Sequence, residues 1–274
     1  HGVHRRQRQM CIRDSYHIAP AVFEELGATT VVIGATPDGY NINDGVGSTE
    51  PAALQAKVLE EGADIGIAFD GDGDRLQMVN AKGGLLTGDD VLYVLAMHRL
   101  ANGDSDAGIV GTLMTNMGLE LALEASGLRL ARAKVGDRYV KELMVAEGWS
   151  LGGESSGHII CGDLSTTGDG VIAALQVLAA VRASGKSLEA LASGFNPLPQ
   201  VLVNVHITKG FDLSAYPTIA EACRRVESEL KGRGRLLLRP SGTEPVIRVM
   251  VEGDDTVAID ALADEVADAI RQAA

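Results

Sequence analysis

The chain has 274 residues, of which 46% are hydrophobic, so it can bury one large core or two to three smaller ones. Its formal net charge of −13 argues against broad binding to nucleic acid or to an anionic membrane surface, because both are polyanions. No apolar run is long enough to span a bilayer, no signal-peptide pattern occurs, and the three cysteines are too scattered for a disulfide framework, so we expect a cytoplasmic protein.

Residues 1–15 differ in character from the rest of the chain. They contain four arginines against a single aspartate and show no amphipathic period. We interpret them as a non-native or disordered leader and leave them out of the fold prediction.

Two predicted strands flank a predicted helix in the next part of the chain. The apolar runs Ala28–Gly34 and Ala63–Phe69 are typical of buried strands, and Glu50–Gly62 has a proline near its start and a glycine at its end, as helices do. This order predicts a βαβ unit with a parallel sheet. The acidic stretch that begins at Asp70 would then follow the carboxyl end of a parallel strand, where open α/β sheets bind ligands.

The chain continues in the same alternation and then changes character. Residues 76–87 are predicted as a hairpin that turns at two adjacent glycines. After the proline-containing stretch Ser193–Gln200, the order strand, helix, strand, strand, helix predicts a small α+β domain. The further predicted helices are 89–101, 118–126, 137–148, 169–184, 216–231 and 256–272. The further predicted strands are 107–113, 128–133, 201–207, 235–238 and 246–253, with short strands around the loop in 149–161.

The acidic loop "DGDGDR", residues 70–75, is the first candidate site. Asp70, Asp72 and Asp74 alternate with glycines, which permit the tight backbone needed to turn three carboxylates toward one point. Convergent carboxylates repel one another unless a cation lies among them, and oxygen ligands suit Mg²⁺. A calcium EF-hand is excluded, because Arg75 follows directly and Ala81 occupies the twelfth position. The alternative is an exposed acidic turn.

The second candidate is the GGESSGH loop, residues 152–158. Glu154, Ser156 and His158 are polar groups in a glycine-rich turn, and a carboxylate that accepts hydroxyl protons is a common way to hold a sugar. The alternative is a hairpin turn whose polar side chains are simply solvated.

The third candidate is the RPSGT loop, here residues 239–249. Ser241, Gly242 and Thr243 offer N–H and hydroxyl donors, and Arg239 and Arg248 offer forked positive charge, which together suit a phosphate dianion. The alternative is an edge turn with solvated arginines. All three loops together indicate a phosphorylated sugar with a divalent metal at the reacting phosphate.

These segments in this order resemble the α-D-phosphohexomutase superfamily, and within it the bacterial phosphoglucosamine mutases. The resemblance covers Tyr16–Ala274 and is carried by the sequences "FDGDGDR", "GTLMTNMGLE", "KVGDRYV", "LGGESSGHII", "TTGDG" and "LRPSGTEPVIRVMVEG". It implies consecutive three-layer α/β/α domains followed by a small α+β domain. The implied boundaries are a partial second domain at 16–82 with the metal loop, a third at 83–194 with the sugar loop, and a C-terminal phosphate-binding domain at 195–274.

The resemblance also implies a reaction and a role for each site residue. Glucosamine 6-phosphate would be converted to glucosamine 1-phosphate through a phosphoserine and a bisphosphorylated sugar. Asp70, Asp72 and Asp74 would bind Mg²⁺, and Arg75 would contact the reacting phosphate. Lys134, Asp137 and Arg138 would line the cleft, and Glu154, Ser156 and His158 would contact the sugar. The second phosphate would be bound by Arg239, Ser241, Gly242, Thr243 and Arg248. The implied partner is a small hexosamine phosphate; the sequence does not define an oligomeric state.

One family feature has no counterpart in the sequence. The family's phosphoserine lies in a "SASHNP"-like loop, and no such loop occurs here. We therefore expect a fragment that is inactive alone. The open alternatives are a phosphomannomutase or phosphoglucomutase of the same superfamily, a non-catalytic sugar-phosphate-binding module, and, more weakly, a phosphatase with Asp70 as nucleophile.

Overall fold

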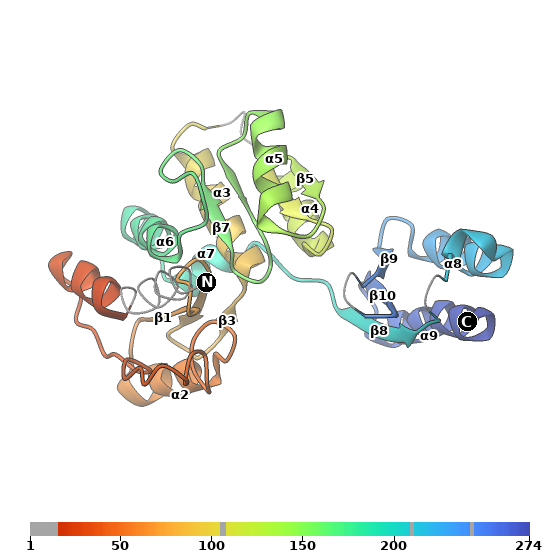
Figure 1. The fold of residues 1–274 in the computed structure, drawn as a ribbon. Coiled ribbons are helices and arrows are strands. Elements are labelled where there is room, and N and C mark those ends of the chain that lie inside the picture. The colour runs from red at the N-terminus through yellow and green to blue at the C-terminus, as the bar shows by residue number, and fades with distance from the viewer. Residues whose placement is uncertain (1–15, 105–107, 209–210, 242–243) are drawn as a thin grey trace. The chain divides into compact units, whose positions relative to one another are not determined.

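The computed structural model describes residues 16–104, 108–208, 211–241 and 244–274. The leader predicted at residues 1–15 lies outside these ranges. The chain divides into two compact units (Figure 1). Unit 1 runs to Phe195 without the short segment Asn116–Gly118, which groups with Asn196–Ala274 in unit 2.

The first part of unit 1 consists of two helices followed by a small antiparallel sheet. Residues 16–25 are helical, and α2 (Ala52–Glu61) ends at Gly62 in the left-handed conformation that glycine adopts readily. Strands β1 (Ile65–Phe69), β2 (Leu76–Asn80) and β3 (Leu85–Leu86) then form a three-stranded sheet in that order. The predicted hairpin of residues 76–87 is confirmed, because β2 and β3 pair with Met78 opposite Leu86.

The predicted parallel βαβ unit is wrong. Residues 28–34 form no strand, and Val31 and Val32 are 54% and 47% exposed. β-Branched residues favour an extended backbone, but a strand also needs a hydrogen-bonding neighbour, and within the described ranges no strand pairs with this segment. Since β1 pairs antiparallel with β2, the acidic loop is the loop of a hairpin and does not follow a parallel strand.

The larger sheet of unit 1 has four strands in the order β5-β4-β6-β7. β4 pairs parallel with β5 and with β6, whereas β7 pairs antiparallel with β6. The strands are β4 (Ile109–Thr112), β5 (Leu130–Ala133), β6 (Leu151–Gly153) and β7 (Ile159–Cys161). The helices are α3 (Gly88–Ala101), α4 (Met117–Ala125), α5 (Asp137–Glu147), α6 (Gly170–Ser184) and α7 (Leu188–Ala192). The predicted α/β alternation is confirmed, and α7 is an addition to it.

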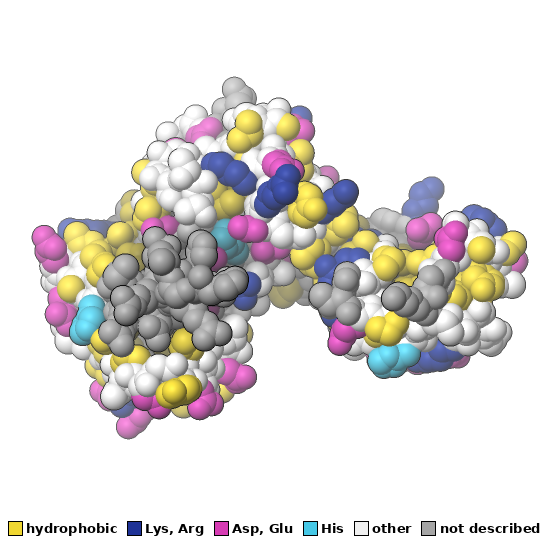
Figure 2. Space-filling model, viewed as in Figure 1, with side chains coloured by type: hydrophobic (Ala, Val, Ile, Leu, Met, Phe, Trp, Pro, Cys, Tyr) yellow, Lys and Arg dark blue, Asp and Glu magenta, His cyan; other side chains and the backbone are white. Residues whose placement is uncertain are grey.

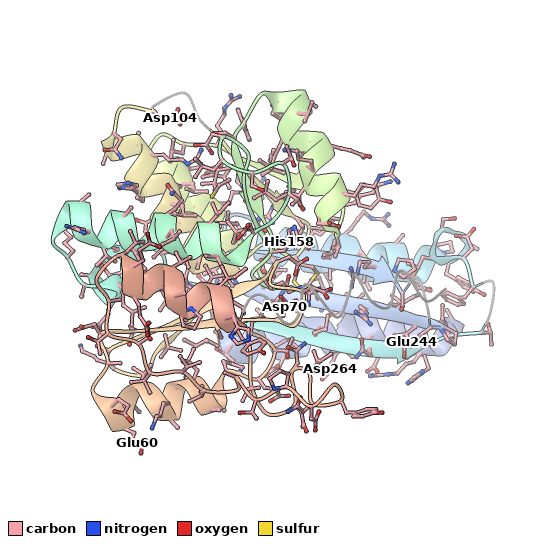
Figure 3. The ribbon with its side chains drawn as sticks, turned by 60° about the vertical axis from the view of Figure 1, so that its left-hand side comes forward. Glu60, Asp70, Asp104, His158, Glu244 and Asp264 are labelled. Carbon is pink, nitrogen blue, oxygen red and sulfur yellow. The ribbon has the colours of Figure 1, made fainter. Side chains whose placement is uncertain are left out.

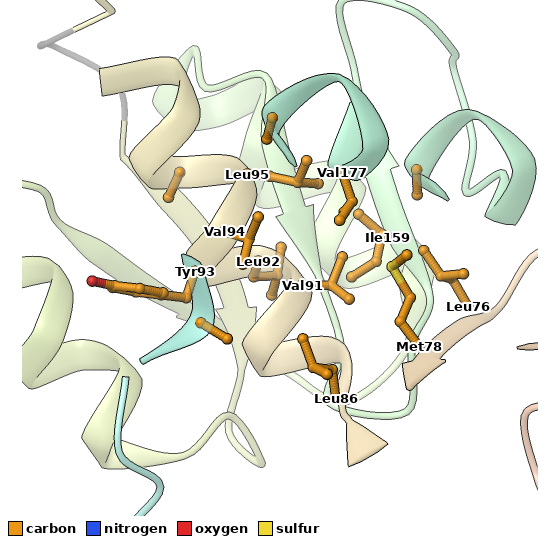
Figure 4. Close-up of a cluster of buried hydrophobic side chains, with 14 of the residues drawn as sticks. Leu76, Met78, Leu86, Val91, Leu92, Tyr93, Val94, Leu95, Ile159 and Val177 are labelled. Atoms are coloured by element: carbon orange, nitrogen blue, oxygen red, sulfur yellow. The ribbon is translucent and has the colours of Figure 1, made fainter. Parts of the chain in front are cut away.

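Helix α3 lies at the centre of the unit 1 core (Figure 4). It starts in a capping box in which Asp90 Oδ2 accepts from the backbone N–H of Thr87 at 2.8 Å. Val91 and Leu92 of this helix pack in one cluster with Met78 of β2 and Ile159 of β7. Each such fully buried side chain stabilises the fold by roughly 2 kcal/mol. Both sheets of unit 1 therefore share one core, and the domain boundary predicted between residues 82 and 83 falls inside that core and stays a prediction.

Unit 2 is the predicted α+β fold. Its antiparallel sheet has the order β8-β10-β9, and α8 and α9 pack their apolar residues against one face of it. The elements are β8 (Gln200–His206), a 3₁₀ turn at Leu213–Ala215, α8 (Pro217–Leu230), β9 (Gly234–Pro240), β10 (Val246–Gly253) and α9 (Thr256–Ala273). Among the described residues, no helix is both long and apolar enough to cross a membrane.

Candidate functional site

The acidic loop connects β1 to β2 of the antiparallel hairpin. Phe69 is paired with Leu76, so the six residues between them form the connection. Asp70 organises the loop, because its backbone carbonyl accepts from the Gly73 amide at 3.1 Å and its Oδ1 accepts from the Arg75 amide at 3.2 Å. Gly73 has a φ of +73°, a conformation that a residue with a Cβ rarely adopts.

Asp70 is the least exposed carboxylate of this loop, with 10% of its side chain exposed. Burial raises the pKa of Asp70, and the neighbouring Asp74 carboxylate raises this pKa further, against the opposing hydrogen bond and charge of Arg75. The Arg75 Nε atom lies 3.8 Å from Asp70 Oδ2. Asp72 is exposed. Two of the three predicted metal ligands therefore face each other, and the third faces solvent.

The donor set fits Mg²⁺ in its chemistry. Asp70 and Asp74 offer only oxygen atoms. The pKa of Asp70 is raised chiefly by burial and further by the Asp74 carboxylate, and a cation between the two carboxylates would offset both effects. No group of three His, Cys, Asp or Glu side chains within the described ranges is arranged to hold a metal. The predicted three-aspartate site therefore needs Asp72 to turn inward, and it stays a prediction.

The GGESSGH loop connects β6 to β7. The Glu154 amide donates to the His158 carbonyl, and the Gly157 amide donates to the Glu154 carbonyl, both at 2.9 Å. Ser156 is exposed at the tip of this turn, whereas His158 is 4% exposed. The predicted sugar-contacting residues thus share one tight turn at the end of β6.

The acidic loop and the GGESSGH loop are joined directly, and in Figure 3 the labelled Asp70 and His158 lie in the same region. The Leu76 amide donates to the Gly157 carbonyl at 2.9 Å, and Arg75 and His158 form an isolated β-bridge. His158 Nδ1 also lies 3.3 Å from Asp74 Oδ2. The fold therefore places the candidate metal loop beside the candidate sugar loop.

The segment Lys134–Arg138 reaches the same region through the backbone. The Gly136 amide, just before α5, donates to Glu154 Oε1 at 3.0 Å. The Lys134 ammonium lies 5.8 Å from the centre of the Tyr139 ring, and the Arg138 Nε atom pairs with Glu142 at 2.8 Å on the exposed face of α5. Figure 2 shows Lys and Arg side chains gathered over this part of unit 1. The cleft-lining roles predicted for Lys134, Asp137 and Arg138 stay predictions.

The TTGDG segment, Thr166–Gly170, also belongs to this region, although the only role predicted for its residues was a helix cap at Thr167 or Asp169. The Gly170 amide donates to the Gly73 carbonyl of the acidic loop at 3.0 Å. Asp169 caps α6, because its Oδ1 accepts from the Ile172 amide at 3.0 Å. Closely spaced glycines before a helix were the available sequence signal.

The RPSGT loop of unit 2 joins β9 to β10. The strand register places Arg239 directly opposite Arg248, and the Arg248 Nη2 atom lies 3.7 Å from Glu244 Oε2. The Ser241 amide donates to the Val246 carbonyl at 2.8 Å. Two cations side by side repel each other, which favours an anion between them. Gly242 and Thr243 lie outside the described residues.

Asn204 is a further candidate that sequence reasoning missed. It lies opposite Arg248 on β8, so Arg239, Arg248 and Asn204 form one row across the three strands. Directly opposite residues of antiparallel strands point to the same face of the sheet, so the Asn204 amide shares a face with both guanidinium groups. Only the pairing register, which the sequence does not give, reveals this row.

Two family models match the chain over more than half of its length. One is "Phosphoglucomutase/phosphomannomutase, alpha/beta/alpha domain III", which matches residues 87–198. The other is "Phosphoglucomutase/phosphomannomutase, C-terminal domain", which matches residues 202–269.

Curated relatives share more than half of the aligned residues with the chain. Phosphoglucosamine mutase of Aeromonas hydrophila is 57% identical over 259 residues, which is 94% of this chain and 58% of that protein. Phosphoglucosamine mutase of Ralstonia nicotianae is 54% identical over 92% of this chain and 57% of that protein. The chain thus spans a little over half the length of these relatives.

Solved structures share the fold at low sequence identity. A phosphoglucomutase/phosphomannomutase family protein of Burkholderia thailandensis matches 94% of this chain and 58% of its own with a TM-score of 0.72 and 22% identity. N-acetylphosphoglucosamine mutase of Aspergillus fumigatus, in complex with GlcNAc-6P and magnesium, matches 86% of this chain and 58% of its own with a TM-score of 0.68 and 21% identity. Together with the loop motifs, the two family models and the curated relatives show that the chain belongs to the phosphoglucomutase/phosphomannomutase family.

Proposed function

We propose that the chain belongs to a phosphoglucosamine mutase. Such an enzyme interconverts glucosamine 6-phosphate and glucosamine 1-phosphate through a phosphoserine and a bisphosphorylated sugar. The names of relatives that are 54% and 57% identical support this reaction. The single observation that carries it is the β-bridge between Arg75 and His158, because it brings a carboxylate loop suited to a metal beside a loop suited to a sugar. A small hexosamine phosphate as partner and a cytoplasmic location belong to the same proposal.

In unit 1, we assign the reacting end of the substrate to the acidic loop. Asp70, Asp72 and Asp74 would hold Mg²⁺, which would neutralise charge on the transferring phosphoryl group when bound. Arg75 would donate its guanidinium N–H groups to the same phosphate. Glu154 and Ser156 would accept and donate hydrogen bonds to sugar hydroxyls, with His158 held beside them.

The Lys134–Arg138 segment would complete the unit 1 site. Its Gly136 amide already holds Glu154, so the segment is placed next to the proposed sugar contact. Lys134 and Arg138 would add positive charge for an anionic substrate, and Asp137 would remain at the start of α5.

In unit 2, we assign binding of a phosphate group to the RPSGT loop. The paired guanidinium groups of Arg239 and Arg248 supply positive charge, and the Ser241 hydroxyl supplies a donor, with Gly242 and Thr243 completing the predicted set. Inorganic phosphate is a direct probe of this assignment. We expect Arg239→Met to weaken phosphate binding, and the same binding by the variant and the original chain would contradict the assignment.

Calorimetry with glucosamine 6-phosphate and Mg²⁺ tests the proposal on the chain itself. We expect binding that Glu154→Ala weakens, and we expect no turnover in a coupled assay, because no serine of the chain matches the family's phosphoserine loop. Conversion of glucosamine 6-phosphate would overturn the expectation of an inactive chain. No binding at millimolar ligand would count against the proposal as a whole.

Competition among glucosamine 6-phosphate, glucose 6-phosphate and mannose 6-phosphate tests the substrate class. The matching family models are named for phosphoglucomutase and phosphomannomutase, whereas the named relatives are phosphoglucosamine mutases. We expect the amino sugar to bind most tightly. Preference for either neutral sugar phosphate would favour the alternative substrate class.

A further inference from the structure

Two glycines of the TTGDG segment stand unusually close to the candidate site. A Cβ placed on Gly168 would lie 2.3, 2.5 and 2.8 Å from three atoms of the His158 imidazole ring. A Cβ on Gly170 would lie 2.7 Å from the Phe69 ring and 2.9 Å from the Arg75 carbonyl oxygen. Neither glycine has a positive φ. Both positions therefore need glycine for space and not for backbone conformation.

The His158 ring cannot retreat easily from the Gly168 side. Its side chain is 5% exposed, and its Nδ1 atom faces Asp74 Oδ2 at 3.3 Å. The backbone of His158 is also fixed, because it pairs with Arg75 and its carbonyl accepts from the Glu154 amide. A ring displaced from Gly168 would move along the line toward the Asp74 carboxylate or out of its buried position.

Gly170, the other glycine of the TTGDG segment, holds the acidic loop in place. The Gly170 amide donates to the Gly73 carbonyl, and Gly170 begins α6, a helix of fifteen residues that packs into the core. Because that helix is anchored by its apolar residues, Gly170 offers the acidic loop a rigid support. The TTGDG segment thus contacts the acidic loop and the GGESSGH loop at once.

We propose that Gly168 and Gly170 are positioning residues that hold His158 against Asp74 and the acidic loop against α6. This inference rests on the proposed function, because its value lies in keeping the metal ligands and the sugar contacts in a fixed relation. Phosphoryl transfer depends chiefly on positioning and on charge stabilisation, so a small shift between these loops is costly. A positioning role also accounts for a glycine-rich segment that itself carries little of the proposed chemistry.

A double-mutant cycle tests the contact between Gly168 and the His158 ring. Gly168→Ala, His158→Ala and the double variant are compared for Mn²⁺ affinity, measured by electron paramagnetic resonance, and for stability against urea. We expect Gly168→Ala to weaken Mn²⁺ binding about tenfold, the scale at which residues that orient metal ligands act. In the His158→Ala background the added methyl group has room, so we expect Gly168→Ala to cause no further loss of affinity or stability.

Gly108→Ala is the matched control. Its Cβ would lie 2.2 Å from the Trp149 ring, so it is crowded to a similar degree, but Gly108 lies at the amino end of β4, away from the loops. We expect this variant to lower the stability of unit 1 and to leave Mn²⁺ affinity unchanged when folded. Equal losses of affinity in Gly108→Ala and Gly168→Ala would show a general loss of stability and overturn the inference.

The cycle separates this inference from the proposed function. Gly168→Ala could lower the free energy of unfolding equally in the original chain and in the His158→Ala background. In that case the contact with the His158 ring does not explain why position 168 needs glycine, and the inference is wrong. If the original chain binds no Mn²⁺, the metal assignment of the proposed function fails. The coupling between the two substitutions in unfolding free energy then decides by itself whether Gly168 positions His158. If the cycle shows coupling and Mn²⁺ affinity does not change, the contact exists but does not position the metal ligands, which also overturns the inference.

Discussion

The Leu76 amide donates a 2.9 Å hydrogen bond to the carbonyl oxygen of Gly157, residues that lie far apart in the sequence. This bond extends the β1–β2 hairpin to the turn between β6 and β7, so the two sheets of unit 1 meet at the two candidate loops. Gly157 has a φ of +97°, and a Cβ there would lie 2.2 Å from the Leu76 carbonyl oxygen. The close approach of the two loops therefore depends on a residue without a side chain.

Gly157→Ala is expected to destabilise unit 1 by about 3 kcal/mol, because it combines an unfavourable φ with a clash against backbone. Urea unfolding followed by the fluorescence of Trp149 measures the change. Gly127→Ala is the control, since Gly127 has a φ of +78° and nothing lies within 4 Å of its Cβ position. We expect the control to cost about 1 kcal/mol from backbone strain alone. Equal costs for both variants would show that the contact with Leu76 is unimportant.

Asp70→Asn is expected to stabilise the chain at pH 7 without divalent cations. The pKa of Asp70 is raised above its ordinary value of 3.8, chiefly by burial. The folded chain therefore binds more protons than the unfolded chain between these two pKa values, and stability falls as pH rises through that window. Asparagine removes the buried charge and this pH dependence while its Oδ1 can still accept from the Arg75 amide.

The same variant is expected to lose stabilisation by Mg²⁺, because a ligand stabilises a protein only when it binds the folded state. Thermal unfolding with and without excess Mg²⁺ measures both effects. Asp64→Asn is the control, since Asp64 is exposed before β1. A Mg²⁺ response that survives in Asp70→Asn would place the metal elsewhere.

Glu154 is expected to hold the start of α5 as well as a sugar hydroxyl. Its Oε1 accepts from the Gly136 amide at 3.0 Å, so Glu154→Ala should speed hydrogen exchange at that amide about tenfold, equivalent to a lost hydrogen bond of about 1.4 kcal/mol. Glu154→Gln keeps an acceptor and should preserve most of the protection. Unchanged exchange in Glu154→Ala would contradict the contact.

Glu252 in unit 2 is a buried carboxylate with no exposed surface, and its Oε2 accepts from Arg235 Nε at 2.7 Å. Arg235→Met is expected to destabilise unit 2 by about 3 kcal/mol, because it removes the cationic partner of a buried carboxylate, which would keep the hydrogen bond from the Met117 amide. Arg233→Met is the control, since Arg233 pairs with Asp254 at 3.6 Å on the surface and such pairs contribute at most about 1 kcal/mol. Hydrogen exchange of β10 amides measures the change in the stability of unit 2 in both variants. Equal effects would mean that Glu252 keeps adequate partners without Arg235.

Local sequence signals predicted most helices of this protein. Gly62 ends α2, Thr87 and Asp90 form a capping box at α3, and Asp169 caps α6, because each acts through neighbours a few residues away. The hairpin of β2 and β3 is also local, because its turn lies between two paired strands. These elements follow from short-range hydrogen bonds that the sequence specifies directly.

The error at residues 28–34 has a non-local cause. β-Branched residues such as Val31 and Val32 indicate an extended backbone, but the formation of a strand depends on a partner that local pattern does not reveal. The acidic loop was recognised from its alternating aspartates, yet its position in an antiparallel hairpin depends on the pairing of Phe69 with Leu76. The metal-binding role inferred from these aspartates stays a prediction, whereas the topology predicted for the loop was wrong.

The sequence by itself determined the α/β character, the loops that carry carboxylates, hydroxyls and arginines, and the family. Only the tertiary structure decided that His158 lies against Asp74, that Gly136 holds Glu154, and that Asn204 shares a row with two arginines. It also showed that Gly168 makes room for the His158 ring. The physical reason is that residue chemistry and local conformation are properties of short segments, whereas strand register and close packing join segments that are distant in sequence.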